Sequence, residues 1–212
     1  PWLIVGGLVG SRMLYVITYW QEDFSGAPLM DIFKIRQGGL VFYGGFIGAT
    51  LCAIFYVRKN KIPIWKMADA LAPSIALGHA FGRLGCLMTG CCYGKACSLP
   101  WSITFPRDHV THPIAVHPTQ LYESFFNFAL FAGLAWIYRK KKFDGQVFAL
   151  YLMAYAFLRA VNELFRGDYE PSKHLGILTP GQLTGILIMS VGIAMWFFCS
   201  SQTRKEKLQN QE

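Results

Sequence analysis

Six long apolar runs constrain the fold of this chain more than any other feature of its sequence. They cover approximately residues 1–20, 39–57, 67–90, 118–138, 145–166 and 178–200. Because an α-helix rises about 1.5 Å per residue, runs of roughly 20 residues match a bilayer's hydrocarbon core, about 30 Å thick. Runs of this length without alternating polar residues favour helices over a β-barrel. We therefore predict an all-α fold, a polytopic transmembrane helical bundle with six spans.

Basic residues gather at one set of span ends, which predicts the orientation in the membrane. Only 15% of the residues are charged, against roughly 25% in soluble proteins. Excess Lys and Arg marks cytoplasmic connections. The basic residues of these connections are Arg58, Lys59, Lys61, Lys66, Arg139, Lys140, Lys141, Lys142, Arg204, Lys205 and Lys207. This pattern places the C-terminus in the cytoplasm and segment 91–117 outside, and it explains the net charge of +8 without a nucleic-acid partner.

The domain organisation is predicted to be simple. We expect one transmembrane domain over residues 1–200, followed by a cytoplasmic tail over 201–212 that is polar enough to be disordered. Glycines recur four residues apart in three of the runs, which predicts close helix packing. The pairs are Gly6 and Gly10, Gly44 and Gly48, and Gly78 and Gly82.

Ionisable residues inside the runs are the strongest candidates for function, because each costs about 2.5 to 3.5 kcal/mol at the bilayer centre. They are Arg12, Asp69, His79, Arg83, Glu123, Arg159, Glu163 and Arg166. The spacing of Arg159, Glu163 and Arg166 predicts one shared helix face. Arg83 and Arg159 outnumber the carboxylates near them, which favours an electropositive pocket. Since a guanidinium can hold two phosphate oxygens, an anionic lipid headgroup would suit this pocket.

Structural roles are the alternatives for several of these residues. Glu163 could form an ion pair that only fixes the helix register. Glu123 follows Pro118 at the start of its run and could stabilise the helix N-terminus. Arg12 and Asp69 lie nearer the ends of their runs, where we expect anchors whose charges reach water.

Segment 78–97 combines many glycines with four cysteines. The glycines are Gly78, Gly82, Gly85, Gly90 and Gly94. They predict a broken helix whose free backbone N–H groups would bind phosphate. The cysteines are Cys86, Cys91, Cys92 and Cys97. Their spacing fits neither zinc nor common iron–sulphur sites, so we expect mostly free thiols and no metal, with a disulfide at Cys92 or Cys97 as an alternative. A nucleophilic cysteine is a weaker alternative.

Three further histidines precede the run that starts near residue 118. His109, His112 and His117 have a spacing that superficially suits metal ligands. Because Pro113 and Pro118 interrupt the segment, we interpret the three histidines as loop residues.

Four segments resemble the bacterial prolipoprotein diacylglyceryl transferases. They are GGLVFYGGFIG at 38–48, GHAFGRLGCLMTGCCYG at 78–94, HPTQLYE at 117–123 and YAFLRAVNELFR at 155–166. They follow the order of the family, and the resemblance covers essentially the whole chain. It implies seven spans, one N-terminal span more than the six predicted here.

The resemblance implies an enzyme of the bacterial cytoplasmic (inner) membrane. Members of the family transfer the diacylglyceryl group of phosphatidylglycerol to the lipobox cysteine of a preprolipoprotein signal peptide, which forms a thioether and releases glycerol phosphate. The implied partners are phosphatidylglycerol, membrane lipid and that signal peptide, with no cofactor and no metal. Residues 1–200 would form the single catalytic domain.

The resemblance also implies site residues. Arg83 and Arg159 would be catalytic and hold the lipid phosphate. Some members have His at the position of Tyr43, so Tyr43 or a solvent-linked histidine is the candidate base. Implied substrate-binding residues are Arg83, Gly85, Gly94, His117, Gln120, Tyr122, Glu123, Glu163 and Arg166. Cys86 and Cys91 replace polar residues of some members, so no role is carried over to them.

Two other classes of protein fit the residues taken alone. An anion transporter could line its path with Arg83 and Arg159. A membrane thiol oxidoreductase could use Cys91 and Cys92. The resemblance favours the transferase over both.

Overall fold

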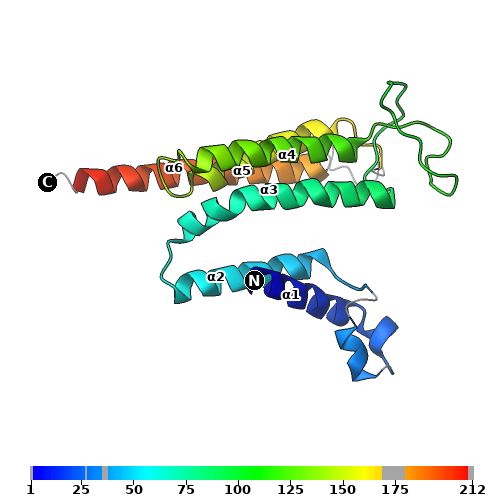
Figure 1. The fold of residues 1–212 in the computed structure, drawn as a ribbon, viewed down its shortest axis with the longest axis horizontal. Coiled ribbons are helices and arrows are strands. Elements are labelled where there is room, and N and C mark those ends of the chain that lie inside the picture. The colour runs from blue at the N-terminus through cyan, green and yellow to red at the C-terminus, as the bar shows by residue number, and fades with distance from the viewer. Residues whose placement is uncertain (1, 27, 35–37, 169–179, 210–212) are drawn as a thin grey trace. The chain divides into compact units, whose positions relative to one another are not determined.

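The computed structural model describes residues 2–26, 28–34, 38–168 and 180–209, and Figure 1 shows that these residues form helices joined by loops. In these residues the β-type pairing is limited to isolated bridges within the loops. The predicted all-α class is therefore confirmed. The chain divides into two compact units, residues 1–64 and 65–212, and each is described by itself.

The first unit consists of two helices that pack against each other and are joined by a connection with two short helical turns. Helix α1 (Trp2–Thr18) is followed by a π-helical turn η1 (Trp20–Phe24) and a 3-10 turn η2 (Leu29–Phe33), and helix α2 (Phe42–Lys59) packs against α1. The connection returns the chain so that the two apolar helices bury one face each.

Four glycines bring α1 and α2 into close contact. A Cβ on Gly6 would lie 2.9 Å from Gly48 O, and one on Gly10 would overlap Gly44 O. The absence of side chains lets the two backbones approach, as predicted for these two pairs. The packing prediction is confirmed here.

Arg12 holds the connection of the first unit in place. Its Nε donates to Ile32 O at 2.7 Å, its Nη2 to Asp31 O at 2.8 Å and its Nη1 to Gly38 O at 2.9 Å. Only 9% of Arg12 is exposed. It is therefore structural, but the expectation that its charge reaches water is wrong, because backbone carbonyls of the connection satisfy the guanidinium instead.

The second unit is a bundle of four long helices. They are α3 (Ile64–Thr89), α4 (Thr119–Tyr138), α5 (Gln146–Glu163) and α6 (Pro180–Gln209), which lie side by side in Figure 1. The core between α3, α4 and α5 is formed by Ala72, Ala76, Leu134, Val147 and Tyr151. Small alanines on α3 let the larger side chains of the neighbouring helices fit against it.

Asp69 connects α3 to the start of α5. The fully buried carboxylate accepts hydrogen bonds from Gly145 N at 2.9 Å and from Phe148 N at 3.0 Å, and it pairs with Lys141 Nζ at 2.9 Å. These contacts satisfy N–H groups that the first turn of a helix leaves without partners. Asp69 is therefore structural, as expected, but the expectation that its charge reaches water is wrong, because Lys141 and two backbone N–H groups satisfy the carboxylate.

Lys141 lies in the loop before α5. Partial burial lowers the pKa of its ammonium, but hydrogen bonds to Asp144 and Asp69 and the charges of both carboxylates outweigh burial and raise the pKa overall.

The glycine-rich segment does not break α3 where the sequence suggested. The helix continues through Gly78, Gly82 and Gly85 and ends before Gly90, whose φ is +74°. A glycine inside a helix costs only about 1 kcal/mol, which the surrounding packing can offset. A Cβ on Gly78 or Gly82 would meet no atom of the described chain within 4 Å, so the close packing predicted for this pair is not seen.

The C-terminal segment is more ordered than expected. Helix α6 extends to Gln209, so the prediction of a disordered tail is wrong for residues 201–209, whereas 210–212 lie outside the described residues. Gln, Arg, Lys, Glu and Leu dominate these positions, and all are good helix formers that continue a helix already begun.

The number of membrane spans stays a prediction. Among the described residues, the helical stretch Gly181–Lys205 is long and apolar enough to cross a membrane, with a mean hydropathy of 1.9, and Trp2–Thr18 is a shorter apolar helix. Helices α3, α4 and α5 carry charged side chains within their apolar stretches.

Candidate active site

Glu123 is the centre of a buried cluster of charges that joins three helices. It lies on α4 and is 4% exposed. Its Oε1 lies 3.0 Å from Arg83 Nη2 on α3, and its Oε2 lies 3.4 Å from Arg159 Nη1 on α5. The amide of Asn162 donates to Oε2 at 2.9 Å. One carboxylate thus holds both guanidinium groups close to each other.

A second ion pair runs along α5. Arg159 Nη2 lies 3.2 Å from Glu163 Oε2, one helical turn further on. The side chains of Arg83 and Arg159 are 17% and 14% exposed. Gly181, at the start of α6, leaves space for the Glu163 carboxylate, since a Cβ there would lie 2.5 Å from Glu163 Oε1. Both arginine side chains are therefore mostly buried, and α6 begins beside the Glu163 carboxylate.

Buried hydrogen bonds hold α4 in register around Glu123. Ser124 Oγ donates to Ala80 O on α3 at 2.9 Å, and Asn127 Nδ2 donates to Glu123 O at 2.8 Å. Sequence reasoning did not select Ser124, Asn127 or Asn162. These three residues could have been found as polar side chains inside long apolar runs, because a buried polar group needs a hydrogen-bond partner.

The charges of this cluster are balanced. Two arginines meet two carboxylates, so the predicted electropositive pocket, in which the arginines outnumber nearby acids, is wrong. The alternative role of Glu123 at the helix N-terminus is also wrong, because its carboxylate faces the arginines. Neither fact was visible in the sequence, since packing of α4 against α3 and α5 decides which charges meet.

Aromatic rings border the cluster. His79 lies one turn before Arg83 on α3, stacks on Tyr155 with a centroid separation of 4.9 Å, and places Nδ1 3.3 Å from Tyr151 OH. Tyr155 also interacts electrostatically with Glu123 and Arg83. His79 therefore has polar and aromatic partners inside the bundle.

The start of α4 holds the turn that follows α3. Thr119 Oγ1 donates to Cys92 O and Gln120 Nε2 donates to Cys91 O, both at 2.7 Å, and neither side chain is more than 1% exposed. Gln120, which was expected to bind substrate, is thus engaged with the protein backbone. The fixed turn positions Cys92, whose Sγ lies 3.5 Å from Arg83 Nη1.

His117 and Tyr122 form a second group near the beginning of α4. His117 Nδ1 lies 3.2 Å from Tyr122 OH, which accepts a hydrogen bond from Trp101 Nε1 at 2.7 Å. The ring of Phe165 packs against both.

The other two loop histidines have structural contacts. His109 Nε2 lies 2.8 Å from Gly90 O, and His112 Nδ1 lies 3.0 Å from Phe105 O. These contacts support the interpretation of His109 and His112 as loop residues.

Gly94, in the connection between α3 and α4, pairs with Arg166, which follows the end of α5. Gly94 N donates to His117 O at 3.0 Å, and a Cβ on Gly94 would lie 2.9 Å from Phe165 O. Gly94 forms an isolated antiparallel bridge with Arg166.

The common helix face predicted for Arg159, Glu163 and Arg166 is correct only for the first two. Helix α5 ends at Glu163, and Arg166 Nε donates to Asp168 Oδ1 at 2.9 Å. Because Arg166 lies in the turn beyond the helix, helical periodicity no longer sets its direction.

Two other predicted site residues lie outside the charge cluster. Gly85 is inside α3, and its backbone is helical, so the expected phosphate-binding break is absent there. Tyr43 lies near the start of α2 in the first unit, and its role as a base stays a prediction.

Three cysteines come together at the end of α3. The Sγ atoms of Cys86, Cys91 and Cys92 all lie within 4.8 Å of one another, and all six cysteines of the chain are free thiols. Desolvation raises the pKa of the Cys91 thiol, but hydrogen bonds from Thr89, Cys86 and Cys92 outweigh it and lower the pKa overall. The disulfide considered for Cys92 or Cys97 is not present, and the spacing argument did not anticipate this cluster.

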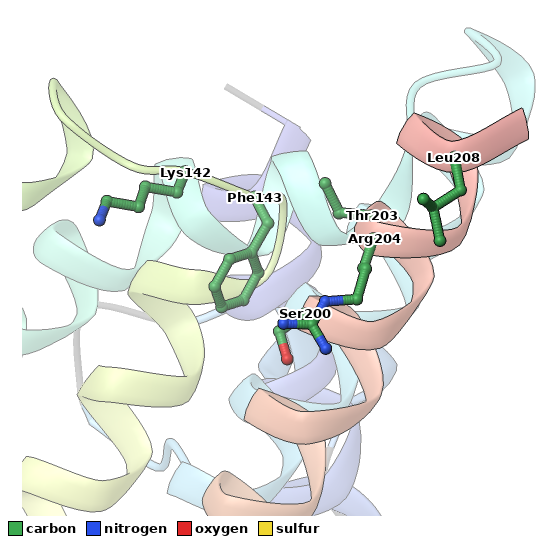
Figure 2. A pocket seen from close by; sticks show the side chains of 6 residues that line it. All are labelled: Lys142, Phe143, Ser200, Thr203, Arg204 and Leu208. Atoms are coloured by element: carbon green, nitrogen blue, oxygen red, sulfur yellow. The ribbon is translucent and has the colours of Figure 1, made fainter. Parts of the chain in front are cut away.

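Two surface hollows of the described residues are lined by residues outside this charge cluster. One, of about 270 Å³, is lined by residues of the loop before α5 and of the end of α6, as Figure 2 shows. They are Lys142, Phe143, Ser200, Thr203, Arg204 and Leu208. The chemistry of the charge cluster, not the size of this hollow, identifies the candidate site.

Comparison with known proteins gives one consistent result. A family described as prolipoprotein diacylglyceryl transferase matches residues 1–198. The chain is 36% identical to the phosphatidylglycerol–prolipoprotein diacylglyceryl transferase of Clostridium tetani over 90% of this chain and 75% of the relative. It is 34% identical to enzyme 2 of that name from Clostridium perfringens over 96% and 78%. It is 37% identical to the one from Finegoldia magna over 92% and 74%.

Proposed function

Because the chain belongs to the prolipoprotein diacylglyceryl transferase family, we propose that it transfers the diacylglyceryl group of phosphatidylglycerol to the cysteine thiol of a prolipoprotein. The observation that supports this most directly is the position of two guanidinium groups. Arg83 and Arg159 both pair with the carboxylate of Glu123, in the interior of the bundle. A pair of enclosed arginines suits the phosphate of a lipid headgroup.

Glu123 positions the arginines before the lipid arrives. A guanidinium has several N–H donors in a planar fork, so one that donates to a carboxylate can also donate to a phosphate oxygen. The balanced charge keeps both arginines stable in a low-dielectric interior while no substrate is bound. Pre-positioned charge costs no reorganisation during the reaction.

The reaction needs a thiolate and a stabilised leaving group. The lipobox thiol, with an ordinary pKa near 8.5, gives its proton to a base, and the thiolate sulphur attacks C3 of the glycerol that carries the acyl chains. A C–S bond forms as the C–O bond to phosphate breaks, and glycerol phosphate leaves with the electron pair of that bond. Arg83 and Arg159 stabilise the charge on the departing phosphate. No metal or cofactor takes part in this scheme.

Tyr43 or a solvent-linked histidine accepts the thiol proton in this proposal. If Tyr43 is the base, the Tyr43→Phe variant should lose most of its turnover while it still binds lipid. An unchanged rate would exclude Tyr43 and leave a histidine.

The setting we propose is the bacterial inner membrane. Residues 1–200 form one catalytic domain with six spans, and the C-terminal end of α6 lies in the cytoplasm. The apolar length of Gly181–Lys205 and the basic residues at alternate connections support this arrangement. The substrate peptide would present its lipobox cysteine at the level of the charge cluster.

A reconstituted assay tests the proposed function. Purified protein is mixed with glycerol-labelled phosphatidylglycerol and a lipobox peptide, and the peptide is analysed by mass spectrometry. Label on the peptide cysteine through a thioether is expected. A peptide with Ser in place of that cysteine is the control. Absence of label with the cysteine peptide, in protein that is folded and embedded in lipid, would refute the proposal.

A further inference from the structure

The cysteine cluster at the end of α3 is not used by the proposed reaction. Its three sulphurs lie within 4.8 Å of one another. With metal–sulphur bonds of about 2.3 Å, sulphurs around a tetrahedral zinc ion lie roughly 3.8 Å apart. A contraction of about 1 Å or less would therefore bring the three thiolates to bonding distance of one ion.

The backbone folds the cluster together. Gly90 ends α3 with a φ of +74°, and Cys92 also has a positive φ of 62°. The chain thus reverses, and Cys91 N donates to Cys86 O at 3.1 Å. The left-handed conformation at a helix end is a common role of glycine.

The turn is also fixed from outside. Thr119 and Gln120, both almost fully buried, donate hydrogen bonds to the carbonyls of Cys92 and Cys91. The backbone at two of the three cysteines is therefore held by the protein before any ligand arrives. Such pre-arrangement lowers the cost of binding.

The charge near the cluster suits thiolates. Arg83 Nη1 lies 3.5 Å from Cys92 Sγ. A divalent ion with three thiolates has a net charge of about −1, which a neighbouring guanidinium stabilises. Soft thiolate ligands select soft or borderline metal ions such as Cu⁺ and Zn²⁺ over Mg²⁺ or Ca²⁺.

We propose that Cys86, Cys91 and Cys92 form a three-thiolate binding site for a thiophilic metal ion, next to Arg83 of the charge cluster. Binding forms three metal–sulphur bonds and releases the thiol protons to solvent, with no change of oxidation state. The open fourth position of a zinc ion would be filled by water.

Metal titration of the reduced full chain tests the site. Cd²⁺ is added to purified protein in detergent, and ultraviolet absorption from thiolate-to-metal charge transfer is followed. We expect a band that saturates at one Cd²⁺ per chain and that Zn²⁺ displaces but Mg²⁺ does not. No band, or a band that Mg²⁺ removes equally well, would overturn the proposal.

Two variants separate the cluster from the other thiols. The combined substitution Cys86→Ser, Cys91→Ser and Cys92→Ser should abolish the band. Cys97→Ser should keep it, because Cys97 lies in the same segment but outside the cluster. A band that survives the triple substitution would contradict the assignment.

A second measurement avoids any dependence on how the triple variant folds. The wild-type chain is alkylated with iodoacetamide with and without Zn²⁺, and each cysteine peptide is quantified by mass spectrometry. Zn²⁺ should protect Cys86, Cys91 and Cys92 severalfold and leave Cys97 unchanged. Equal labelling of the three with and without Zn²⁺ would refute the site, whatever the transferase assay shows.

Discussion

Glu123 decides where both arginines of the candidate site lie. Each of its oxygens meets a different guanidinium, one from α3 and one from α5, and Asn162 adds a hydrogen bond to the second oxygen. The structural role of these ion pairs and the function we propose for them are therefore not alternatives. The same carboxylate joins the three helices and, in the proposed function, holds the guanidinium donors that contact the phosphate.

The Glu123→Gln substitution should damage both stability and activity. It keeps the shape of the side chain but leaves two mostly buried guanidiniums without their shared negative charge, which we expect to cost about 3 kcal/mol of unfolding free energy. Transfer of labelled lipid should fall at least tenfold, and thermal unfolding in detergent should occur at lower temperature. The exposed Glu22→Gln serves as the control, and equal stability of the two variants would contradict the central role of Glu123.

Arg83 and Arg159 should not tolerate lysine. An ammonium keeps the charge but lacks the planar fork, so a contact worth about 1.5 to 3 kcal/mol is weakened and kcat should drop by roughly tenfold to a hundredfold. The label-transfer assay measures this, with Arg139→Lys at the end of α4 as the matched control. Full activity of both Arg83→Lys and Arg159→Lys would refute the phosphate clamp.

At the scale of the elements, the paired glycines on α1 and α2 lie at a contact between helices, whereas those on α3 do not. The first set lies at a backbone contact, whereas Gly78 faces no atom of the described chain within 4 Å. The same four-residue spacing in sequence therefore corresponds to two different environments.

Substitution by alanine should separate these environments. Gly10→Ala forces Cβ against Gly44 O and within 2.9 Å of Gly48 Cα, and overpacking of this kind costs about 1 to 3 kcal/mol. Gly78→Ala should be neutral or stabilise α3 by up to about 1 kcal/mol, because alanine is the better helix former. Thermal unfolding of both variants checks this, and a larger loss in Gly78→Ala would contradict it.

The link between α3 and α5 should give a pH-dependent stability. The pKa of Lys141 is raised in the folded state by Asp144 and Asp69, so its contribution is complete below the unfolded pKa of about 10.4 and is lost as pH rises through the higher folded value. Between neutral pH and about 9.5 we expect no change from this group. Above that range, the unfolding temperature of the wild type should fall more steeply than that of Lys141→Gln. Lys140→Gln should behave as the wild type, and parallel curves for all three would exclude the effect.

At the scale of the whole molecule, the alternation of basic connections predicts the sidedness of the chain. Cysteines introduced as Lys140→Cys and Ser201→Cys should react with a membrane-impermeant maleimide only after cells are permeabilised. Val110→Cys, in the exposed loop between α3 and α4, should react in intact cells. Peptide mass spectrometry distinguishes each site from the native thiols. Labelling of position 140 or 201 in intact cells would reverse the proposed orientation.

The sequence by itself determined the helices and the residues worth examining. Apolar runs predicted at 118–138 and 145–166 correspond to Thr119–Tyr138 and Gln146–Glu163, because helical periodicity and hydrophobicity are local properties of the chain. The cost of a charge in an apolar run likewise selected Arg83, Arg159 and Glu163 without any structure. The family followed from four short segments.

Only the tertiary structure decided which of those residues meet. The approach of Glu123 to both arginines depends on the packing of α4 against α3 and α5, and sequence spacing contains no information about that geometry. The three-sulphur cluster depends on the positive φ of Gly90, which reverses the chain, and the sequence spacings known from metal sites do not describe this turn. Local sequence preferences determine where a helix forms. Contacts between side chains that are distant in sequence depend on how the helices pack, so the candidate site could be identified only from the tertiary structure.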